Sequence, residues 1–277
     1  MDIVYILKGI VIAIVEGITE FLPVSSTGHL IITGSLLKFG EGDFEKMYMV
    51  VIQLGAILAI VALYREKLFA AVRSLIRKEK RGIRFALAIV IGIIPAMIFG
   101  FTLEDVIDKY LFSVPTVIMG LVVGAVLMIY FEKKYRGRST TKAIEKIKPA
   151  QALKVGLFQV MSLWPGMSRS ASTIMGGWHQ GLSPEIAAEY SFFLAIPIMI
   201  GASGLKFAKY AVQGGFSAIT ATQVITLIIG FIVAFFVALY VVKAFMAYIK
   251  KKPMKIFAYY RFALAGVLSI LLLLSVL

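Results

Sequence analysis

The sequence contains no cysteine, and only two of its 277 residues are histidine. The lack of cysteine excludes disulfide bonds and thiol chemistry. Charged residues are scarce, at 16% of the chain, and no polar stretch is long enough to form a separate soluble domain with its own core. The N-terminus lacks the basic region of a secretory signal peptide, so we expect no cleaved leader.

Apolar residues dominate instead: 60% of the chain is hydrophobic and its mean hydropathy is +0.91. These values predict an all-α integral membrane protein, because crossing a bilayer takes about 20 apolar residues per helix. Six stretches are long enough to be transmembrane helices: residues 47–64, 85–103, 114–131, 186–205, 224–242 and 262–277.

Four further apolar stretches are too short to span a bilayer: residues 3–15, 30–37, 153–163 and 174–178. They flank two segments rich in glycine, proline and hydroxyl groups. We define these as the first polar segment (residues 16–29) and the second polar segment (residues 165–173). This pattern predicts two re-entrant segments, each a broken helix that enters the membrane and returns to the same side.

Positive charge is unevenly distributed along the chain, whose net charge is +14. Of the 29 lysines and arginines, 22 fall in residues 65–84, 132–154 and 243–261. All three segments join apolar stretches, so the positive-inside rule predicts that they are cytoplasmic and that both termini lie outside. We expect them to contact membrane lipids rather than nucleic acid.

The two halves of the chain repeat the same pattern of apolar stretches. Aligning Pro23 with Pro165, an offset of 142 residues, superimposes the long stretches of residues 1–132 on those of residues 150–277. We therefore predict a single membrane domain, residues 1–277, built as an inverted-topology repeat around a basic cytoplasmic loop. The two broken segments would enter from opposite faces and meet near the midplane.

The first polar segment combines carboxylates, hydroxyls and an imidazole at membrane depth, where each ionisable group costs a few kcal/mol or more. Glu16 and Glu20 are four residues apart and share one helix face, so they must bind a cation, share a proton or face an arginine. Ser26 and His29 are close enough to form a nucleophile–base pair. Ser25 and Thr27 add donors at a helix N-terminus, a natural anion site.

The second polar segment carries a cation in place of the acids. Arg169 can bind phosphate through two parallel hydrogen bonds. Hydroxyl groups surround it, on Ser168, Ser170, Ser172 and Thr173. Carboxylates for a divalent metal, an arginine for phosphate and a hydroxyl or imidazole nucleophile together predict phosphoryl transfer. At this depth, the predicted substrate is a lipid phosphate.

These motifs resemble the two signatures of the undecaprenyl-pyrophosphate phosphatase family linked to bacitracin resistance. The resembling stretches are residues 16–29 (EGITEFLPVSSTGH), 164–170 (WPGMSRS), 53–55 (QLG) and 189–192 (EYSF). The resemblance implies a bacterial plasma-membrane enzyme that converts undecaprenyl pyrophosphate to undecaprenyl phosphate and so recycles the carrier lipid of cell-wall synthesis. It also implies a divalent cation, Mg²⁺ or Ca²⁺, and an active site open to the outer face.

The resemblance further implies a role for each site residue. Glu16 and Glu20 would hold the cation or position water, and either Ser26 or His29 would attack the terminal phosphorus. The residues that would clamp the diphosphate are Ser25, Thr27, Ser168, Arg169, Ser170 and Thr173. The sequence does not decide between the two nucleophiles; we favour Ser26, assisted by His29.

A transporter is the alternative function, because inverted repeats with broken helices at the midplane are also a transporter architecture. Such a protein would move a lipid phosphate across the bilayer as a flippase. Transport needs no nucleophile beside paired carboxylates, so we favour the enzyme. The sequence leaves the oligomeric state open.

Overall fold

Helices make up the regular structure of the protein in the computed structural model, which describes residues 2–40, 42–111, 113–212, 215 and 219–276. Across these ranges there is no β-strand, and one isolated bridge joins Thr141 to Leu182. The all-α prediction is therefore confirmed. Leu277, the last residue of the sixth predicted span, lies outside the described residues.

The described residues contain six helices that are long and apolar enough to cross a membrane, and each coincides with one predicted span. They are α3 (Asp43–Leu63), α5 (Lys80–Thr102), α7 (Val114–Tyr135), α10 (Pro184–Val212), α11 (Ala221–Lys251) and α12 (Lys255–Leu273). Several run beyond the predicted limits. Helix α11, for example, continues nine residues past the predicted end at residue 242, because Lys243 and the residues that follow still favour helix.

The four short apolar stretches form short helices on either side of the polar segments. These are α1 (Ile3–Thr19) and α2 (Ser26–Leu37) around the first segment, and α8 (Pro149–Val160) and α9 (Arg169–His179) around the second. Proline interrupts both pairs, at Pro23 and Pro165, because its ring and missing N–H are incompatible with a helix interior. The remaining short elements are α4 (Arg65–Ile76), α6 (Glu104–Tyr110), η1 (Ile144–Lys146) and η2 (Met161–Leu163).

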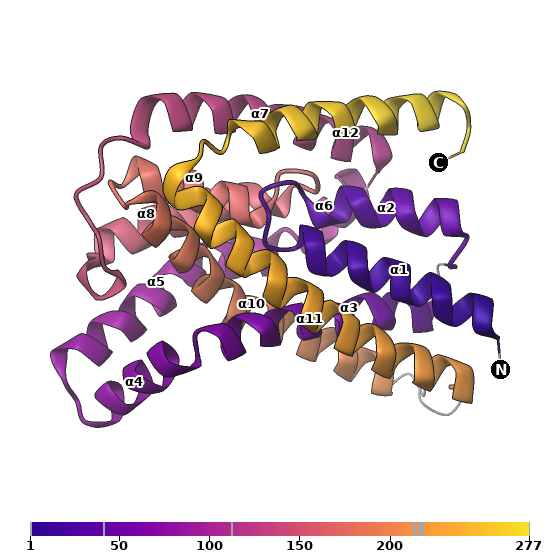
Figure 1. Cartoon of the computed structure of the whole chain (residues 1–277), viewed down its shortest axis with the longest axis horizontal. Helices are drawn as coiled ribbons and strands as arrows, with labels where there is room; N and C mark the ends of the chain where they lie inside the picture. Colours follow the sequence, from indigo (N-terminus) through magenta and orange to yellow (C-terminus); the bar gives the residue numbers. More distant parts are fainter. Residues whose placement is uncertain (1, 41, 112, 213–214, 216–218, 277) are drawn as a thin grey trace.

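The helices pack in pairs that link the two halves of the chain (Figure 1). Helix α1 lies along α11 and α8 lies along α5, while α7 pairs with α12 and α3 with α10. Small residues allow close approach: a Cβ added to Gly156 on α8 would lie 2.5 Å from the carbonyl oxygen of Gly92 on α5. Both broken-helix pairs are thereby held against long helices of the opposite half.

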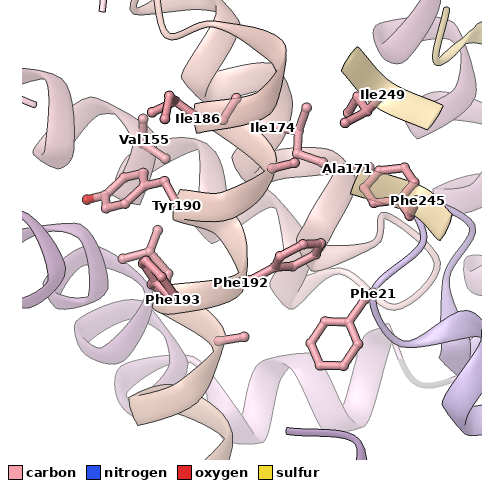
Figure 2. Close-up of a cluster of buried hydrophobic side chains, with 14 of the residues drawn as sticks. Phe21, Val155, Ala171, Ile174, Ile186, Tyr190, Phe192, Phe193, Phe245 and Ile249 are labelled. Carbon is pink, nitrogen blue, oxygen red and sulfur yellow. The ribbon is translucent and has the colours of Figure 1, made fainter. Parts of the chain in front are cut away.

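An aromatic cluster packs against the first polar segment (Figure 2). Phe21, in the break between α1 and α2, packs edge-on against Phe192 of α10 with ring centroids 5.5 Å apart. Phe192 in turn contacts Phe245 of α11 at 6.2 Å. Ala171 and Ile174 on the buried face of α9 belong to the same core. Residues of both polar segments therefore pack into the hydrophobic core.

Candidate functional site

The two polar segments meet at one cavity of about 200 Å³. The first segment contributes Glu20, Ser25, Ser26 and Thr27, and the second contributes Pro165, Gly166, Ser168 and Arg169. Gln53, Ser162 and Met199 complete the lining. Two segments that are more than 130 positions apart in the sequence thus line a single polar pocket inside an apolar bundle.

The backbone makes the same unusual turn where each segment meets the cavity. Ser25 and Ser168, the residues preceding α2 and α9, have φ angles of 71° and 69°. A positive φ at a non-glycine residue is strained and is commonly found at functional sites. Each turn directs the first residues of a helix towards the cavity, where unpaired backbone N–H groups and the helix dipole favour an anion.

Glu20 connects the two segments. One carboxylate oxygen, Oε2, accepts a hydrogen bond of 2.7 Å from the Ser26 hydroxyl. The other, Oε1, lies 3.5 Å from Nη2 of Arg169. Only 9% of the Glu20 side chain and 13% of the Arg169 side chain are exposed, so solvent screens this ion pair little.

Arg169 is fixed by contacts with α10 and with the break between α1 and α2. Its Nη1 donates to the carbonyl oxygen of Ser191 on α10 at 2.9 Å and lies 3.4 Å from the Ser191 hydroxyl. Its guanidinium carbon sits 5.8 Å from the ring centroid of Phe21, a cation–π arrangement. Its Nε is buried and has no hydrogen-bond partner in the described part of the chain. The guanidinium therefore keeps donor capacity for a ligand.

Glu16 lies one turn before Glu20 on α1 and is completely buried. Neither of its carboxylate oxygens has a hydrogen-bond partner among the residues that the structure describes. A buried carboxylate left as a bare anion is costly, so a proton or a cation must compensate it. Its oxygens fit a hard divalent cation, which prefers carboxylate ligands.

The site does not form a closed metal cage. Within the part of the chain that the structure describes, no three side chains of His, Cys, Asp or Glu gather closely enough to enclose an ion. Magnesium is commonly bound by one or two carboxylates together with phosphate oxygens of a substrate. Glu16 and Glu20 fit that mode of binding.

Besides the fully buried Glu16, three residues predicted for the site do not line the cavity. Ser170 donates to the carbonyl oxygen of Leu22 at 2.9 Å, and Thr173 donates to the Ser191 hydroxyl at 2.6 Å. His29 lies 2.8 Å from the carbonyl oxygen of Ser25 through Nδ1 and 2.6 Å from the Tyr260 hydroxyl through Nε2. All three link elements around the pocket, and both ring nitrogens of His29 have partners other than Ser26.

Arg261 on α12 is a residue of the site region that the sequence patterns did not single out. It is fully buried, and its guanidinium has no carboxylate partner among the described residues. It donates instead to four backbone carbonyls, those of Gly120, Leu121, Gly166 and Met167, at 2.8–3.2 Å. The basic segment 243–261 masked it, because its charge looked like one more cytoplasmic lysine or arginine.

The four hydrogen bonds of Arg261 tie the second polar segment to α7. Gly124 makes room for the guanidinium, since a Cβ there would lie 2.1 Å from Nη2. The carbonyl of Met167 faces Arg261, so in a planar trans peptide the N–H of Ser168 is directed away from it. Arg261 thus fixes the turn that presents Ser168 and Arg169 to the cavity.

Comparison with known proteins places the chain in one family over nearly its whole length. The family described as Bacitracin resistance protein BacA matches residues 9–267. Undecaprenyl-diphosphatase of Clostridium tetani (strain Massachusetts / E88) is 54% identical over 266 residues, which cover 96% of each chain. Undecaprenyl-diphosphatase 2 of Clostridioides difficile (strain 630) is 48% identical over 279 residues, covering 98% of this chain and 96% of that protein.

Replacing Arg261 with methionine should destabilise the protein strongly. Arg261→Met would leave buried carbonyls without donors, and we expect a loss of about 3 kcal/mol or more, measured as a lower melting temperature in detergent. The melting temperature of Arg261→Lys should lie between those of the wild type and Arg261→Met, because an ammonium has fewer donors than a guanidinium. Arg138→Met, at an exposed arginine, is the control. Equal melting temperatures for Arg261→Met and the control would contradict the clamp.

Proposed function

The chain belongs to the bacitracin resistance protein BacA family and is an undecaprenyl-diphosphatase, and we propose that the cavity between the two polar segments is its active site. It is a hydrolase and a multi-pass membrane protein whose substrate is a lipid diphosphate. The observation that carries the proposal is the hydrogen bond from the Ser26 hydroxyl to Glu20, beside Arg169. A potential nucleophile, its base and a phosphate-binding cation are thereby within one pocket.

Ser26 is the nucleophile in this proposal, and Glu20 is its base. The Ser26 oxygen attacks the terminal phosphorus while its proton passes to Glu20, which already accepts that hydrogen bond at 2.7 Å. The bond from phosphorus to the bridging oxygen breaks, and undecaprenyl phosphate leaves. Water then hydrolyses the phosphoserine, releases phosphate and restores the Ser26 hydroxyl.

The diphosphate binds between the two polar segments. Arg169 supplies its guanidinium, while Ser191 holds Nη1 in position. The first backbone N–H groups of α2 and α9, together with Thr27 and Ser168, add neutral donors. These groups stabilise charge that accumulates on the phosphoryl oxygens as the reaction proceeds.

Glu16 and Glu20 would hold a divalent cation, Mg²⁺ or Ca²⁺, in this proposal. When bound, the cation neutralises phosphate charge and polarises the phosphoryl oxygens. The unpartnered oxygens of Glu16 support this assignment, because a buried carboxylate without a hydrogen-bond partner among the described residues needs a cation or a proton to offset its charge.

His29 acts as a positioning residue rather than as the nucleophile. Its Nδ1 contacts the carbonyl oxygen of Ser25, whose strained backbone directs Ser26 into the cavity. Its Nε2 contacts Tyr260, which is adjacent to Arg261 on α12. The imidazole therefore ties the first polar segment to the helix that also holds the second.

The packing of the helices supports an inverted repeat with two re-entrant segments. Under the repeat, α1 corresponds to α8 and α5 corresponds to α11. Helix α1 packs along α11 just as α8 packs along α5, which is the exchange expected of two intertwined halves. The two serines with positive φ, Ser25 and Ser168, also support the repeat. They are 143 residues apart, one more than the offset of 142 between the aligned prolines.

The site opens to the outer face and both termini lie outside in this proposal. Figure 1 shows the basic α4–α5 hairpin and the α7–α8 connection at one end of the bundle, and the start of α1 and the end of α12 at the other. Basic connections mark the cytoplasmic side, so the opposite end is assigned to the outside.

Removing the nucleophile or its base should abolish phosphate release from a C55 or C15 prenyl diphosphate. We expect Ser26→Ala to lower kcat by about 1,000-fold or more and Glu20→Gln by about 100- to 10,000-fold. Ser269→Ala, a hydroxyl removed on α12 that bonds the Ala265 carbonyl, is the control. Acid quenching of the wild type with labelled substrate should trap an acid-stable phosphoserine. An acid-labile phosphohistidine lost in His29→Ala would assign the attack to His29 instead.

Loss of a carboxylate should weaken the metal requirement measurably. Chelation should stop the reaction, and Glu16→Gln should raise the concentration of Mg²⁺ or Ca²⁺ needed for half-maximal rate by roughly 10- to 100-fold. Glu66→Gln, whose side chain is 92% exposed, should leave the metal curve unchanged. An unaltered metal curve in Glu16→Gln would remove Glu16 from the cation site.

The absence of cysteine makes the orientation directly measurable. In intact cells, a membrane-impermeant maleimide should label Ser275→Cys but not Lys142→Cys, which should react only after permeabilisation. The wild type supplies an unlabelled background. The reverse pattern of labelling would invert the proposed topology.

A further inference from the structure

Helices α4 and α5 form a hairpin at one end of the bundle (Figure 1). Residues of this hairpin line a second cavity, separate from the proposed active site, whose volume is about 240 Å³. None of its lining residues belongs to either polar segment. Four basic residues line it, Lys67, Arg73, Arg77 and Arg81, against two acidic ones, Glu79 and Glu145. The cavity therefore carries net positive charge.

Most of the charged groups around this cavity already have partners. Lys67 pairs with Glu189 on α10, and Arg81 lies 3.2 Å from Glu145. Glu79 accepts a hydrogen bond of 2.7 Å from Ser74. The guanidinium groups of Arg73 and Arg77 have no hydrogen bond or ion pair to any residue that the structure describes. Two arginines at the cavity thus remain able to bind an anion.

The hairpin that carries these arginines is tightly fixed. The buried Ser74 hydroxyl bonds Glu79 and also accepts from the N–H of Gly82 at 3.0 Å. Gly82 lies so close to α4 that an added Cβ would be 2.2 Å from the backbone nitrogen of Leu75. The walls of the cavity are therefore set by the packing of α4 against α5.

Helix α4 also presents an apolar stripe that nothing in the described chain covers. Phe69, Val72 and Ile76 are 71%, 53% and 76% exposed and share one face of the helix. At 12 residues, α4 is too short to cross a bilayer, and it directly connects α3 and α5, both candidate spans. It therefore lies at a membrane surface, with the apolar stripe suited to the acyl region and the basic residues at headgroup level.

We propose that the α4–α5 cavity binds the phosphate headgroup of an anionic phospholipid, with Arg73 and Arg77 as its ligands. The acyl chains of that lipid lie along the apolar stripe of α4. Charge selects an anionic headgroup over a zwitterionic one, because the four basic residues at the cavity outnumber its two carboxylates. This site is independent of the proposed catalytic residues.

Native mass spectrometry of the detergent-solubilised protein tests the proposal. Dioleoylphosphatidylglycerol, dioleoylphosphatidylcholine and inorganic phosphate are titrated separately into the wild type and into Arg73→Gln/Arg77→Gln. The double variant should bind phosphatidylglycerol roughly 30-fold more weakly, because each arginine near a lipid surface contributes about 1 kcal/mol to binding. Wild-type affinity for this lipid should also fall with salt. Arg138→Gln/Lys142→Gln removes the same charge elsewhere on the basic side and should change the dissociation constant by less than about threefold.

Each remaining outcome is decisive. Equal affinity of the wild type and Arg73→Gln/Arg77→Gln for phosphatidylglycerol would overturn the site. Equal wild-type affinity for phosphatidylcholine would overturn the charge selection. Binding of inorganic phosphate that depends on Arg73 and Arg77, without matching lipid binding, would identify a free-phosphate site and overturn the lipid source. Arg73 and Arg77 are exposed, so their replacement should leave folding intact, which the melting temperature checks.

Discussion

The architecture of the site depends on the hydrogen bonds between the buried guanidinium of Arg261 and four backbone carbonyls. A guanidinium in an apolar bundle needs hydrogen-bond acceptors, and here four backbone carbonyls of α7 and the second polar segment supply them. Those same bonds immobilise a segment that proline and glycine would otherwise leave without regular structure. The position of Arg169 follows from that restraint, and so does its approach to Glu20.

Helix α12 unites the two polar segments through neighbouring residues. Tyr260 contacts His29 near the start of α2, while Arg261 binds the turn before α9. A shift of α12 would therefore displace both halves of the pocket together. This arrangement can preserve a 2.7 Å hydrogen bond between Ser26 and Glu20 opposite an arginine that lies more than a hundred residues away in the chain.

The apolar surroundings strengthen the electrostatic interactions of these polar groups. Phe21 and Phe192 pack beneath the pocket, so the Glu20–Arg169 pair acts in a medium of low dielectric constant. The α4–α5 cavity is a different kind of site, with exposed arginines at a membrane surface. Buried charges suit catalysis on a diphosphate, whereas surface charges suit reversible contact with lipid headgroups.

The sequence by itself determined the helical class and the six spans, and it predicted the polar residues that we propose for the site. Hydrophobic length and buried ionisable groups are local properties of the chain, and a bilayer makes them unambiguous. Only the tertiary structure decided which atoms meet. The bond from Ser26 to Glu20, the partners of His29 and the clamp by Arg261 depend on the packing of α1, α9 and α12. No periodicity encodes such contacts, because a lone arginine in a basic segment looks the same whether it faces water or four buried carbonyls.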